Sequence, residues 1–252
     1  MGTALIRDWQ PQQTWVFVVG TLAWKHTDQF ASFPQENRRD AALVRFFTEQ
    51  GVPAAQMLYL QDKQATWAQI NQSLAAHLAK AQKGDLLFLY YCGHGYKLDS
   101  GDTCFACYDA GDKGIDGWVA ETIPATIERH FLGTRAILAA DCCCSGSLTA
   151  SVQAQAKRIS YACFTSSSAN ESSTGNWTFT EGLLDGLRGE AYSDADDSLG
   201  ITISELANQI IADMAFAEEQ RTSFITTGAF NPNMVLAPAR RKTDPRIGER
   251  VE

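Results

Sequence analysis

Two nearly continuous apolar runs, at residues 85–94 and 135–143, constrain the fold of this chain more than any other feature. A strand that is apolar on both faces belongs in the middle of a parallel sheet, because helices cover both sides of such a sheet. Strand-like runs alternate with helix-like segments along most of the chain. The sequence therefore predicts an α/β, three-layer fold with a mostly parallel six-stranded sheet and helices on both faces.

The same patterns give the expected elements and their boundaries. Strands are expected at residues 15–20, 57–60, 85–94, 135–143 and 159–165, with a last strand within 224–236. Helices are expected at 37–51, 66–83, 118–131, 179–187 and 204–219, whereas 97–117 and 145–158 are expected to be loops. Residues 1–13 are interpreted as an N-terminal extension, 14–237 as one domain, and 238–252 as a polar, disordered tail.

Composition and charge narrow the class of protein. The net charge of −8 argues against nucleic acid as the main partner. No apolar run approaches the roughly 20 residues that span a bilayer, and the first residues lack a signal-peptide pattern, so a cytoplasmic protein without membrane contact is expected. Three of the seven cysteines are contiguous, which favours free thiols over a disulfide framework.

Each of the two central runs ends in a residue suited to covalent catalysis. His94 lies between two glycines, and Cys143 follows Asp141 at the start of a predicted turn. The working sites of open α/β sheets lie at the carboxyl ends of the strands, so neighbouring strands would bring His94 and Cys143 together. A general base beside a thiol is the minimum equipment for acyl transfer. A core-packing histidine and buried structural thiols are the alternative interpretation.

His94 and Gly95, together with residues 141–146, resemble the paired signatures of metacaspases and other bacterial caspase-like peptidases. The resemblance extends over roughly residues 14–237 and implies the caspase-like three-layer fold. It implies that Cys143 is the nucleophile, that His94 is its partner, and that the N–H groups of Gly95 and Cys143 stabilise the oxyanion. No cofactor is expected to be required.

The triple cysteine departs from the metacaspase pattern. Metacaspases usually have a histidine directly after the catalytic cysteine, and this chain has Cys144 there. If the strand continues to Cys143, alternation of side chains points Cys142 and Cys144 away from the face that holds Cys143. A reactive role for Cys142 or Cys144 stays an open alternative.

The resemblance also implies a substrate class, namely proteins and peptides with Arg, or secondarily Lys, at P1. Metacaspases hold such side chains with acidic residues, and Asp141 and Asp40 stand at the corresponding positions. Cys92 is expected to line the same pocket. A solvated position on the helix surface is the alternative for Asp40.

Activation by cleavage is a further implication of the resemblance. Lys157 and Arg158 lie in the expected loop 145–158, where an upstream protease or a second copy of the enzyme would cut, and Arg240 and Arg241 are a second candidate. A solvated turn is the alternative for the first pair. Bacterial relatives often act in defence or cell-death pathways. The rival to a peptidase is an inactive caspase-like scaffold that acts through protein contacts.

Three patterns suggest metal sites of decreasing strength. A partial match to a calcium loop lacks the glycine that the sharp turn requires, because Leu199 stands there; its ligands would be Asp194, Asp196, Ser198 and Glu205. A second acidic loop, which would bind calcium or border the substrate cleft, contains Asp99, Asp102, Asp109 and Asp112. Cys104 and Cys107 have the spacing of half a zinc site, but no second pair completes it, so they are interpreted as core cysteines.

Overall fold

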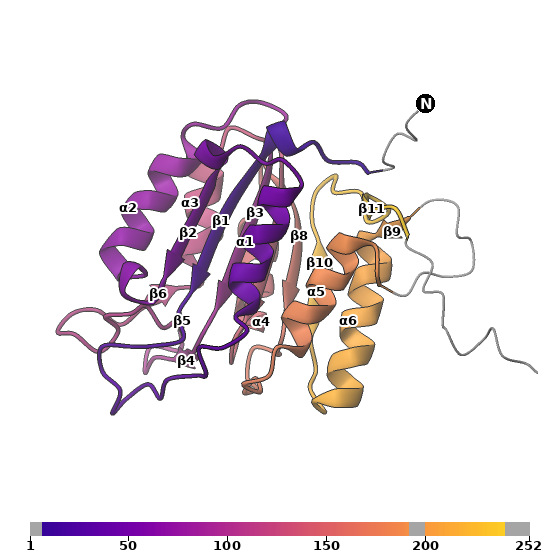
Figure 1. Ribbon diagram of the computed structural model, residues 1–252. Coiled ribbons are helices and arrows are strands. Elements are labelled where there is room, and N and C mark those ends of the chain that lie inside the picture. The colour runs from indigo at the N-terminus through magenta and orange to yellow at the C-terminus, as the bar shows by residue number, and fades with distance from the viewer. Residues whose placement is uncertain (1–6, 192–199, 240–252) are drawn as a thin grey trace, which may run out of the picture.

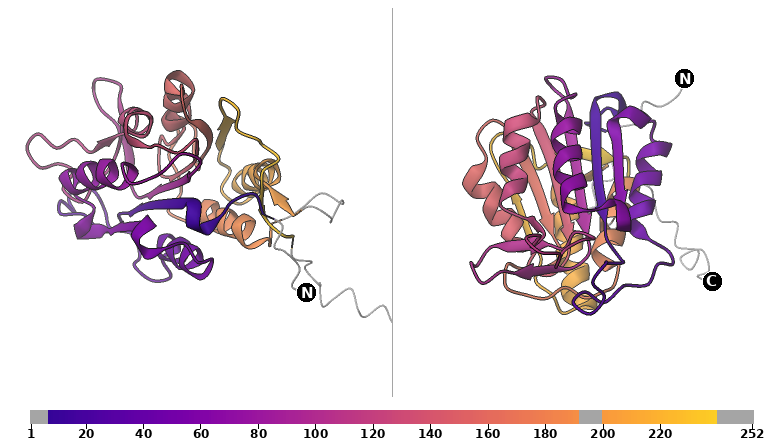
Figure 2. Two further views of the ribbon diagram at one scale, coloured as in Figure 1. Left: turned by 90° about the horizontal axis from the view of Figure 1, so that it is seen from above. Right: turned by 90° about the vertical axis from the view of Figure 1, so that its left-hand side faces the viewer.

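A computed structural model describes residues 7–191 and 200–239 and shows a three-layer α/β/α arrangement (Figure 1). One face of the central sheet is covered by α1 (Arg39–Glu49), α5 (Thr178–Arg188) and α6 (Ile203–Ala217). The other face is covered by α2 (Trp67–Leu78), α3 (Thr122–His130) and α4 (Gly146–Gln155). The view from above separates the same layers (Figure 2). The predicted fold class is confirmed.

The central sheet has six strands in the order β10-β8-β7-β3-β1-β2. Their bounds are Thr14–Gly20 for β1, Met57–Gln61 for β2, Leu86–Cys92 for β3, Arg135–Asp141 for β7, Ser160–Thr165 for β8 and Ser223–Thr226 for β10. Five strands are parallel, and β10 runs antiparallel to β8 at the edge. The two apolar runs of the sequence become the neighbours β3 and β7, as their burial on both faces predicts.

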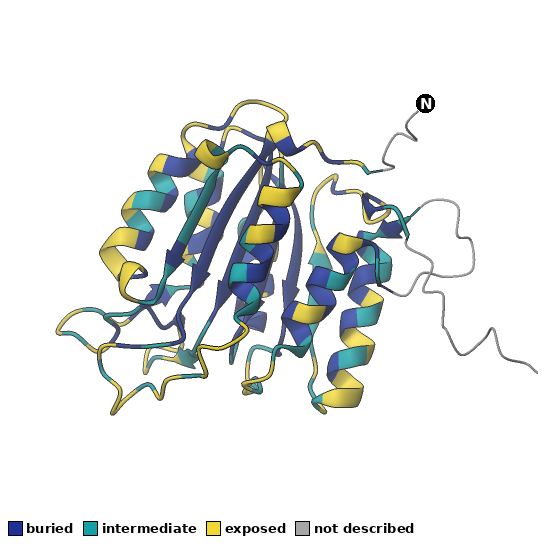
Figure 3. Cartoon of the chain, viewed as in Figure 1, coloured by how far each residue is buried: buried dark blue, intermediate teal, exposed yellow. Residues whose placement is uncertain are grey.

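The side chains of the central strands feed two separate cores because successive residues point to opposite faces. On β1, Val16 and Val18 pack beneath α1 and α5, whereas Phe17 and Val19 pack beneath α2 and α3. The inner strands β1, β3, β7 and β8 are almost fully buried, whereas the edge strands β2 and β10 are mostly half-buried, and most exposed residues lie on the outer faces of the helices and on the loops (Figure 3). Each fully buried side chain of this size stabilises the fold by about 1.5–3 kcal/mol.

The loop predicted for residues 145–158 is wrong, because α4 occupies most of it. Four of its six buried residues are small or hydroxylated, and only Leu148 and Val152 add larger apolar side chains, so the apolar stripe in the sequence is short. The hydroxyls are satisfied inside the helix: Ser151 Oγ donates to the Ser147 carbonyl at 2.8 Å, and Thr149 Oγ1 donates to the Gly146 carbonyl at 2.7 Å. Such internal bonds offset much of the desolvation cost of burying polar side chains.

The helix predicted for residues 118–131 is also too long. Trp118–Val119 forms the short strand β6, which pairs with β5 (Thr103–Phe105), and β5 pairs with β4 (Gly95–Lys97). This three-stranded sheet lies at the carboxyl ends of the central strands (Figure 1). It also replaces part of the loop predicted for residues 97–117, and it continues the chain directly from His94 into β4.

The ends of the described chain meet on the opposite side of the molecule from β4–β6. β9 (Ile201–Thr202) and β11 (Val235–Ala237) form a two-stranded sheet, so the segment 224–236 contributes to two strands rather than one. Trp9 is buried against Phe46 and Phe47, and its indole N–H donates to the Leu236 carbonyl at 2.8 Å. Residues 7–13 therefore pack on the domain. Within the described ranges, no helix combines the length and apolar character needed to cross a membrane.

Candidate active site

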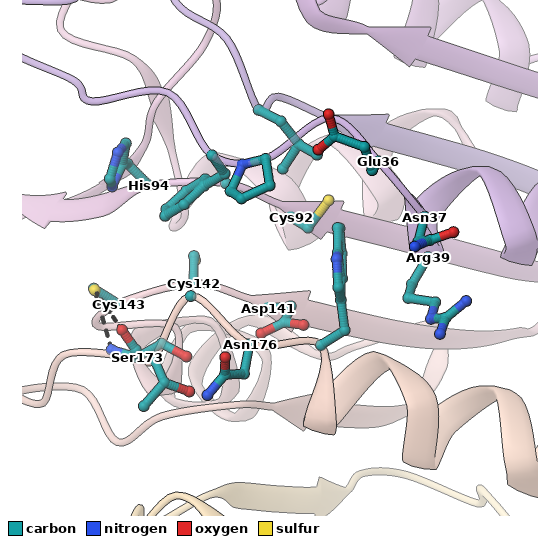
Figure 4. Close-up of a pocket in the computed structure, with 17 residues that line it drawn as sticks. Glu36, Asn37, Arg39, Cys92, His94, Asp141, Cys142, Cys143, Ser173 and Asn176 are labelled. Atoms are coloured by element: carbon teal, nitrogen blue, oxygen red, sulfur yellow. Dashed lines mark hydrogen bonds between the residues drawn. The ribbon is translucent and has the colours of Figure 1, made fainter.

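The carboxyl ends of β1, β3 and β7 meet beside a cavity of about 560 Å³. In the sheet, Gly20 pairs with Cys92 and Cys92 pairs with Asp141, so the last residues of the three strands stand in one row. The chemically informative residues of the lining are Glu36, Asn37, Arg39, Cys92, His94, Asp141, Cys142, Cys143, Ser173 and Asn176. Figure 4 shows His94 and Cys143 toward one end of the cavity, with Asn37 and Arg39 toward the other.

His94 is held by the loop at residues 21–37, which lies between β1 and α1. Its Nε2 lies 2.8 Å from the Ala31 carbonyl oxygen, and its ring contacts Trp24 and Phe33 with centroids 4.5 and 4.6 Å away. A carbonyl oxygen only accepts hydrogen bonds, so Nε2 carries the proton. In the neutral ring, Nδ1 is then the nitrogen with a free lone pair. The loop thus fixes both the orientation and the tautomer of the histidine.

The Cys143 thiol lies on a turn beyond the end of β7 and contacts the backbone of Ser173 (Figure 4). Its Sγ accepts the Ser173 N–H at 3.0 Å and lies 3.7 Å from the Ser173 carbonyl oxygen. Within residues 7–191 and 200–239, no hydrogen bond joins Cys143 to His94. The two residues share one cavity, but the sulfur faces the segment between β8 and α5.

The environments of the neighbouring thiols differ for a reason other than strand alternation. β7 ends at Asp141, so all three cysteines lie on the turn and the argument from an extended strand does not apply. Cys142 is buried, and this burial raises the pKa of its thiol well above the usual range. Cys144 has a φ of 57°, and burial raises the pKa of its thiol as well. Neither neighbour is activated by its surroundings.

Gly95 brings the backbones after β3 and β7 into direct contact. A Cβ at this position would lie 2.0 Å from the Cys143 carbonyl oxygen and 3.0 Å from the Cys142 sulfur. Only glycine allows such an approach. The two residues whose N–H groups were predicted to stabilise the oxyanion, Gly95 and Cys143, therefore lie next to each other.

Asp141 supplies a buried carboxylate at the cavity. Its Oδ2 accepts the hydroxyl of Thr180 at 2.6 Å. Burial raises the pKa of Asp141 to about 6, against the opposing effect of hydrogen bonds from Thr180 and Ser166. Cys92 lies beside it, buried, and burial raises the pKa of that thiol well above its usual range. Glu36, which the sequence analysis missed, adds a second carboxylate to the lining from an exposed loop that no local pattern marks.

Asp40 does not line this cavity, and it is not solvated either. Its carboxylate is fully buried and pairs with Arg38, with an Nη2–Oδ2 distance of 2.7 Å. Tyr59 also donates its hydroxyl to Oδ2 at 2.7 Å. The sequence gives no sign of the contact with Arg38, because side chains two positions apart do not face each other on a helix. The negative charge of Asp40 is thus balanced inside the protein.

Lys157 and Arg158 connect α4 to β8 and are held against the end of α3. The backbone N–H groups of both residues donate to the Glu128 carboxylate at 3.0 Å. The Arg158 guanidinium donates to the carbonyls of Glu128, Phe131 and Gly133. Cleavage here therefore requires these contacts to open. Arg240 and Arg241 lie outside the described residues.

Several of the predicted metal ligands that the structure describes are engaged in other contacts. Glu205 forms a capping box with Thr202 at the start of α6, while Asp194, Asp196 and Ser198 lie outside the described residues. In the second acidic loop, Asp102 bonds Ser100, Asp109 accepts the Trp67 N–H, and Asp112 bonds Lys25 and His26. Among the described residues, no group of three or more potential ligands forms a metal site.

Cys104 and Cys107 are fully buried, as expected of core cysteines. Cys104 lies on β5, and Cys107 follows the end of this strand by two residues. Burial raises the pKa of Cys104 to about 12, so its thiol stays protonated at neutral pH.

Comparison with known proteins gives one family and one structural likeness. The family model described as the caspase domain, a peptidase family, matches residues 33–236, which include His94 and Cys143. No curated protein matches the chain. The crystal structure of protein GSU0716 from Geobacter sulfurreducens matches with a TM-score of 0.64 and 17% sequence identity, covering 90% of this chain and 100% of that one. At this identity the likeness shows the fold.

Proposed function

Because this chain belongs to the caspase-domain family of cysteine peptidases, we propose that it is an endopeptidase with Cys143 as nucleophile and His94 as its acid–base partner. One observation carries the proposal: His94 and Cys143 line the same cavity, and the Ala31 carbonyl leaves Nδ1 of His94 free to act as a base. The sequence neighbours Cys142 and Cys144 are less suitable nucleophiles, since burial raises the pKa of both thiols.

The reaction follows from these roles. His94 takes the thiol proton on Nδ1, and the Cys143 sulfur attacks the scissile carbonyl carbon, forming the S–C bond of a tetrahedral intermediate. The N–H groups of Gly95 and Cys143 stabilise its oxyanion. His94 then gives its proton to the leaving amine as the C–N bond breaks. His94 then deprotonates a water molecule, which attacks the thioester carbonyl carbon. The S–C bond breaks, and His94 returns the proton to the Cys143 sulfur.

The charges of the cavity support a basic P1 side chain. Asp141 and Glu36 provide two carboxylates, whereas the cation at the far end, Arg39, is paired with Glu181 at 2.6 Å. A guanidinium that replaces water at Asp141 forms charge-assisted and potentially bidentate hydrogen bonds with it. We therefore assign P1 Arg, then Lys, to Asp141 and Glu36, with Cys92 on the wall between them, and leave Asp40 out of direct substrate contact.

The contact between Cys143 and Ser173 supports an enzyme that is synthesised as an inactive precursor. The sulfur accepts a hydrogen bond from a backbone N–H on the segment between β8 and α5. We infer that this segment moves before the sulfur attacks a substrate. Cleavage after Arg158 or calcium binding at the loop with Asp194, Asp196 and Glu205 would be the trigger. A place in a bacterial defence or cell-death pathway is proposed from the family alone.

The same contact favours one alternative, a catalytically inactive scaffold. If the segment never leaves Cys143, the fold would act only through protein contacts. Cys144, in place of the histidine that metacaspases usually have, agrees with this alternative.

The test is hydrolysis of fluorogenic peptides with Arg, Lys or Asp at P1, with and without calcium. We expect cleavage after Arg and Lys that is absent in both Cys143→Ala and His94→Ala. A thiol-directed probe, such as a peptidyl chloromethyl ketone with P1 Arg, locates the reactive cysteine by mass spectrometry. Absence of cleavage and of selective labelling at Cys143, before and after limited trypsin treatment, would support the scaffold.

A further inference from the structure

Arg38 is the most highly connected buried cation of the described chain outside the proposed chemistry. Its guanidinium donates to Asp40, to Asp62 at 2.6 Å, to the Gly20 carbonyl at 2.9 Å and to the Gln35 side chain at 2.8 Å. Only 7% of its side chain is exposed. This degree of engagement indicates a role in holding several segments at fixed positions rather than in binding a ligand.

Asp62 connects Arg38 to the other end of the same loop. While its Oδ2 accepts from Arg38, its Oδ1 accepts the backbone N–H groups of Leu22 and Ala23 at 2.8 and 3.2 Å. Leu22 and Ala23 begin the loop that leaves β1, and Arg38 ends it at the start of α1. The Arg38–Asp62 pair therefore closes the loop at residues 21–37 on itself.

This closed loop holds the histidine. It supplies the Ala31 carbonyl that accepts from Nε2 and the aromatic rings of Trp24 and Phe33 that contact the imidazole. It also supplies Glu36 and Asn37 to the cavity. A shift of the loop would therefore move the histidine and one wall of the cavity together.

We propose that Arg38 is a positioning residue that fixes the orientation and tautomer of His94 by closing the loop at residues 21–37. The expected loss of activity rests on the proposed function, whereas the expected change in the His94 tautomer does not. Lysine cannot replace Arg38, because a single ammonium cannot bond Asp40, Asp62 and the Gly20 carbonyl from one planar fork. The negative charge of Asp40 holds the Arg38 guanidinium in the position from which it donates to Asp62.

The test compares four variants. Arg38→Met removes the Arg38–Asp62 pair that closes the loop and leaves Asp40 without its cation, whereas Arg38→Lys keeps the positive charge. The double variant Arg38→Met with Asp40→Asn removes both buried charges together, which preserves folding better than removing one partner. Arg45→Met is the matched control, because Arg45 lies on the exposed side of the same helix.

Two readouts are measured on each folded variant. The first is the 15N NMR spectrum of the imidazoles, with the His94 signals identified among four histidines by their loss in His94→Ala. The second is the pH profile of kcat and KM on a P1 Arg peptide. We expect a single Nε2–H tautomer for His94 in the wild type and in Arg45→Met. The Arg38 variants should show mixed tautomers, a kcat lower by about 100-fold, the scale of a misplacement near 1 Å, and a raised KM, because the same loop carries Glu36.

The outcomes separate this inference from the proposed function. A wild-type tautomer and an unchanged kcat in the double variant would overturn the role of Arg38. A changed tautomer in a chain without any peptidase activity would support the role of Arg38 and refute the proposed function. A loss of kcat with an unaltered His94 spectrum and an unaltered pH profile would also overturn the inference, since the loss would then arise elsewhere.

Discussion

Replacing Asp141 by Asn should make the protein more stable while removing its preference for P1 Arg. Burial raises the pKa of this carboxyl from 3.8 to about 6. One unit of pKa corresponds to about 1.4 kcal/mol, so the ionised carboxylate destabilises the folded state by an upper value of about 3 kcal/mol. Only 8% of the surface of Asp141 is exposed, so solvent screening reduces this value little.

The sign gives the effect a distinctive dependence on pH. The folded state prefers the protonated carboxyl, so the stabilising contribution is complete below the unfolded pKa of 3.8 and is lost as pH rises through about 6. Asn cannot ionise, and its amide oxygen still accepts the Thr180 hydroxyl. Asp141→Asn should therefore be more stable than the wild type above pH 6, by up to about 3 kcal/mol, and the difference should vanish near pH 4.

Urea unfolding followed by the fluorescence of the six tryptophans, at several pH values between these limits, measures the difference. Glu36→Gln is the matched control, since it removes a cavity carboxylate that is exposed and should leave stability unchanged. A difference that does not depend on pH, or an Asn variant that is less stable at neutral pH, would refute the burial argument. Retention of the Arg preference in Asp141→Asn would refute its place in the P1 pocket.

Three further predictions concern other parts of the molecule. The Gln220 amide hydrogen-bonds both the Ser172 carbonyl and the Thr174 N–H, so Gln220→Ala should free the segment around Ser173 and increase the rate at which iodoacetamide alkylates Cys143. An equal rate would contradict the inference that this segment restrains Cys143. Arg158→Met should lower the free energy of unfolding by about 2 kcal/mol, because charged hydrogen bonds to three carbonyls are lost, whereas Lys157→Met should have no effect in the same urea assay. Burial lowers the pKa of His77 to about 4, so the contribution of the neutral imidazole to the free energy of unfolding is complete above pH 6.5 and is lost as pH falls through 4. In His77→Gln the free energy of unfolding should therefore decrease less between pH 6.5 and 4. An unchanged decrease would exclude His77 as its source.

The sequence predicts those parts of the fold whose residues are buried on both faces. β1, β3 and β7 each contain a continuous apolar run and are buried along nearly their whole length. α4 was not predicted, because most of its buried residues are small or hydroxylated and its apolar stripe consists of Leu148 and Val152 alone. The strands also end two residues earlier than their apolar runs, which places Cys143 on a turn and removes the basis for the alternation argument.

The site was predictable as a set of residues but not as a set of contacts. His94, Cys143 and Asp141 stand out because each lies at or near the end of an apolar run in the sequence. The bond between Cys143 and Ser173 and the bond between Arg38 and Asp62 join loops that are far apart in sequence. Asp40 was identified from its place in a motif, yet its partner is decided by how the loop folds back. Contacts between loops depend on tertiary geometry that local patterns do not encode.

The order of the strands divides the molecule along one seam, between β7 and β8. Everything before Lys157 builds β2, β1, β3 and β7, while everything after Arg158 builds β8, β10, α5 and α6. A nick at this junction would leave two pieces that each keep whole strands and remain joined by the β7–β8 ladder. The first piece carries His94 and Cys143, and the second carries Ser173 and Asn176. If the two pieces were expressed separately, the cavity would form only when they associate. The junction is therefore a natural division point for a split reporter whose signal is the reactivity of the Cys143 thiol.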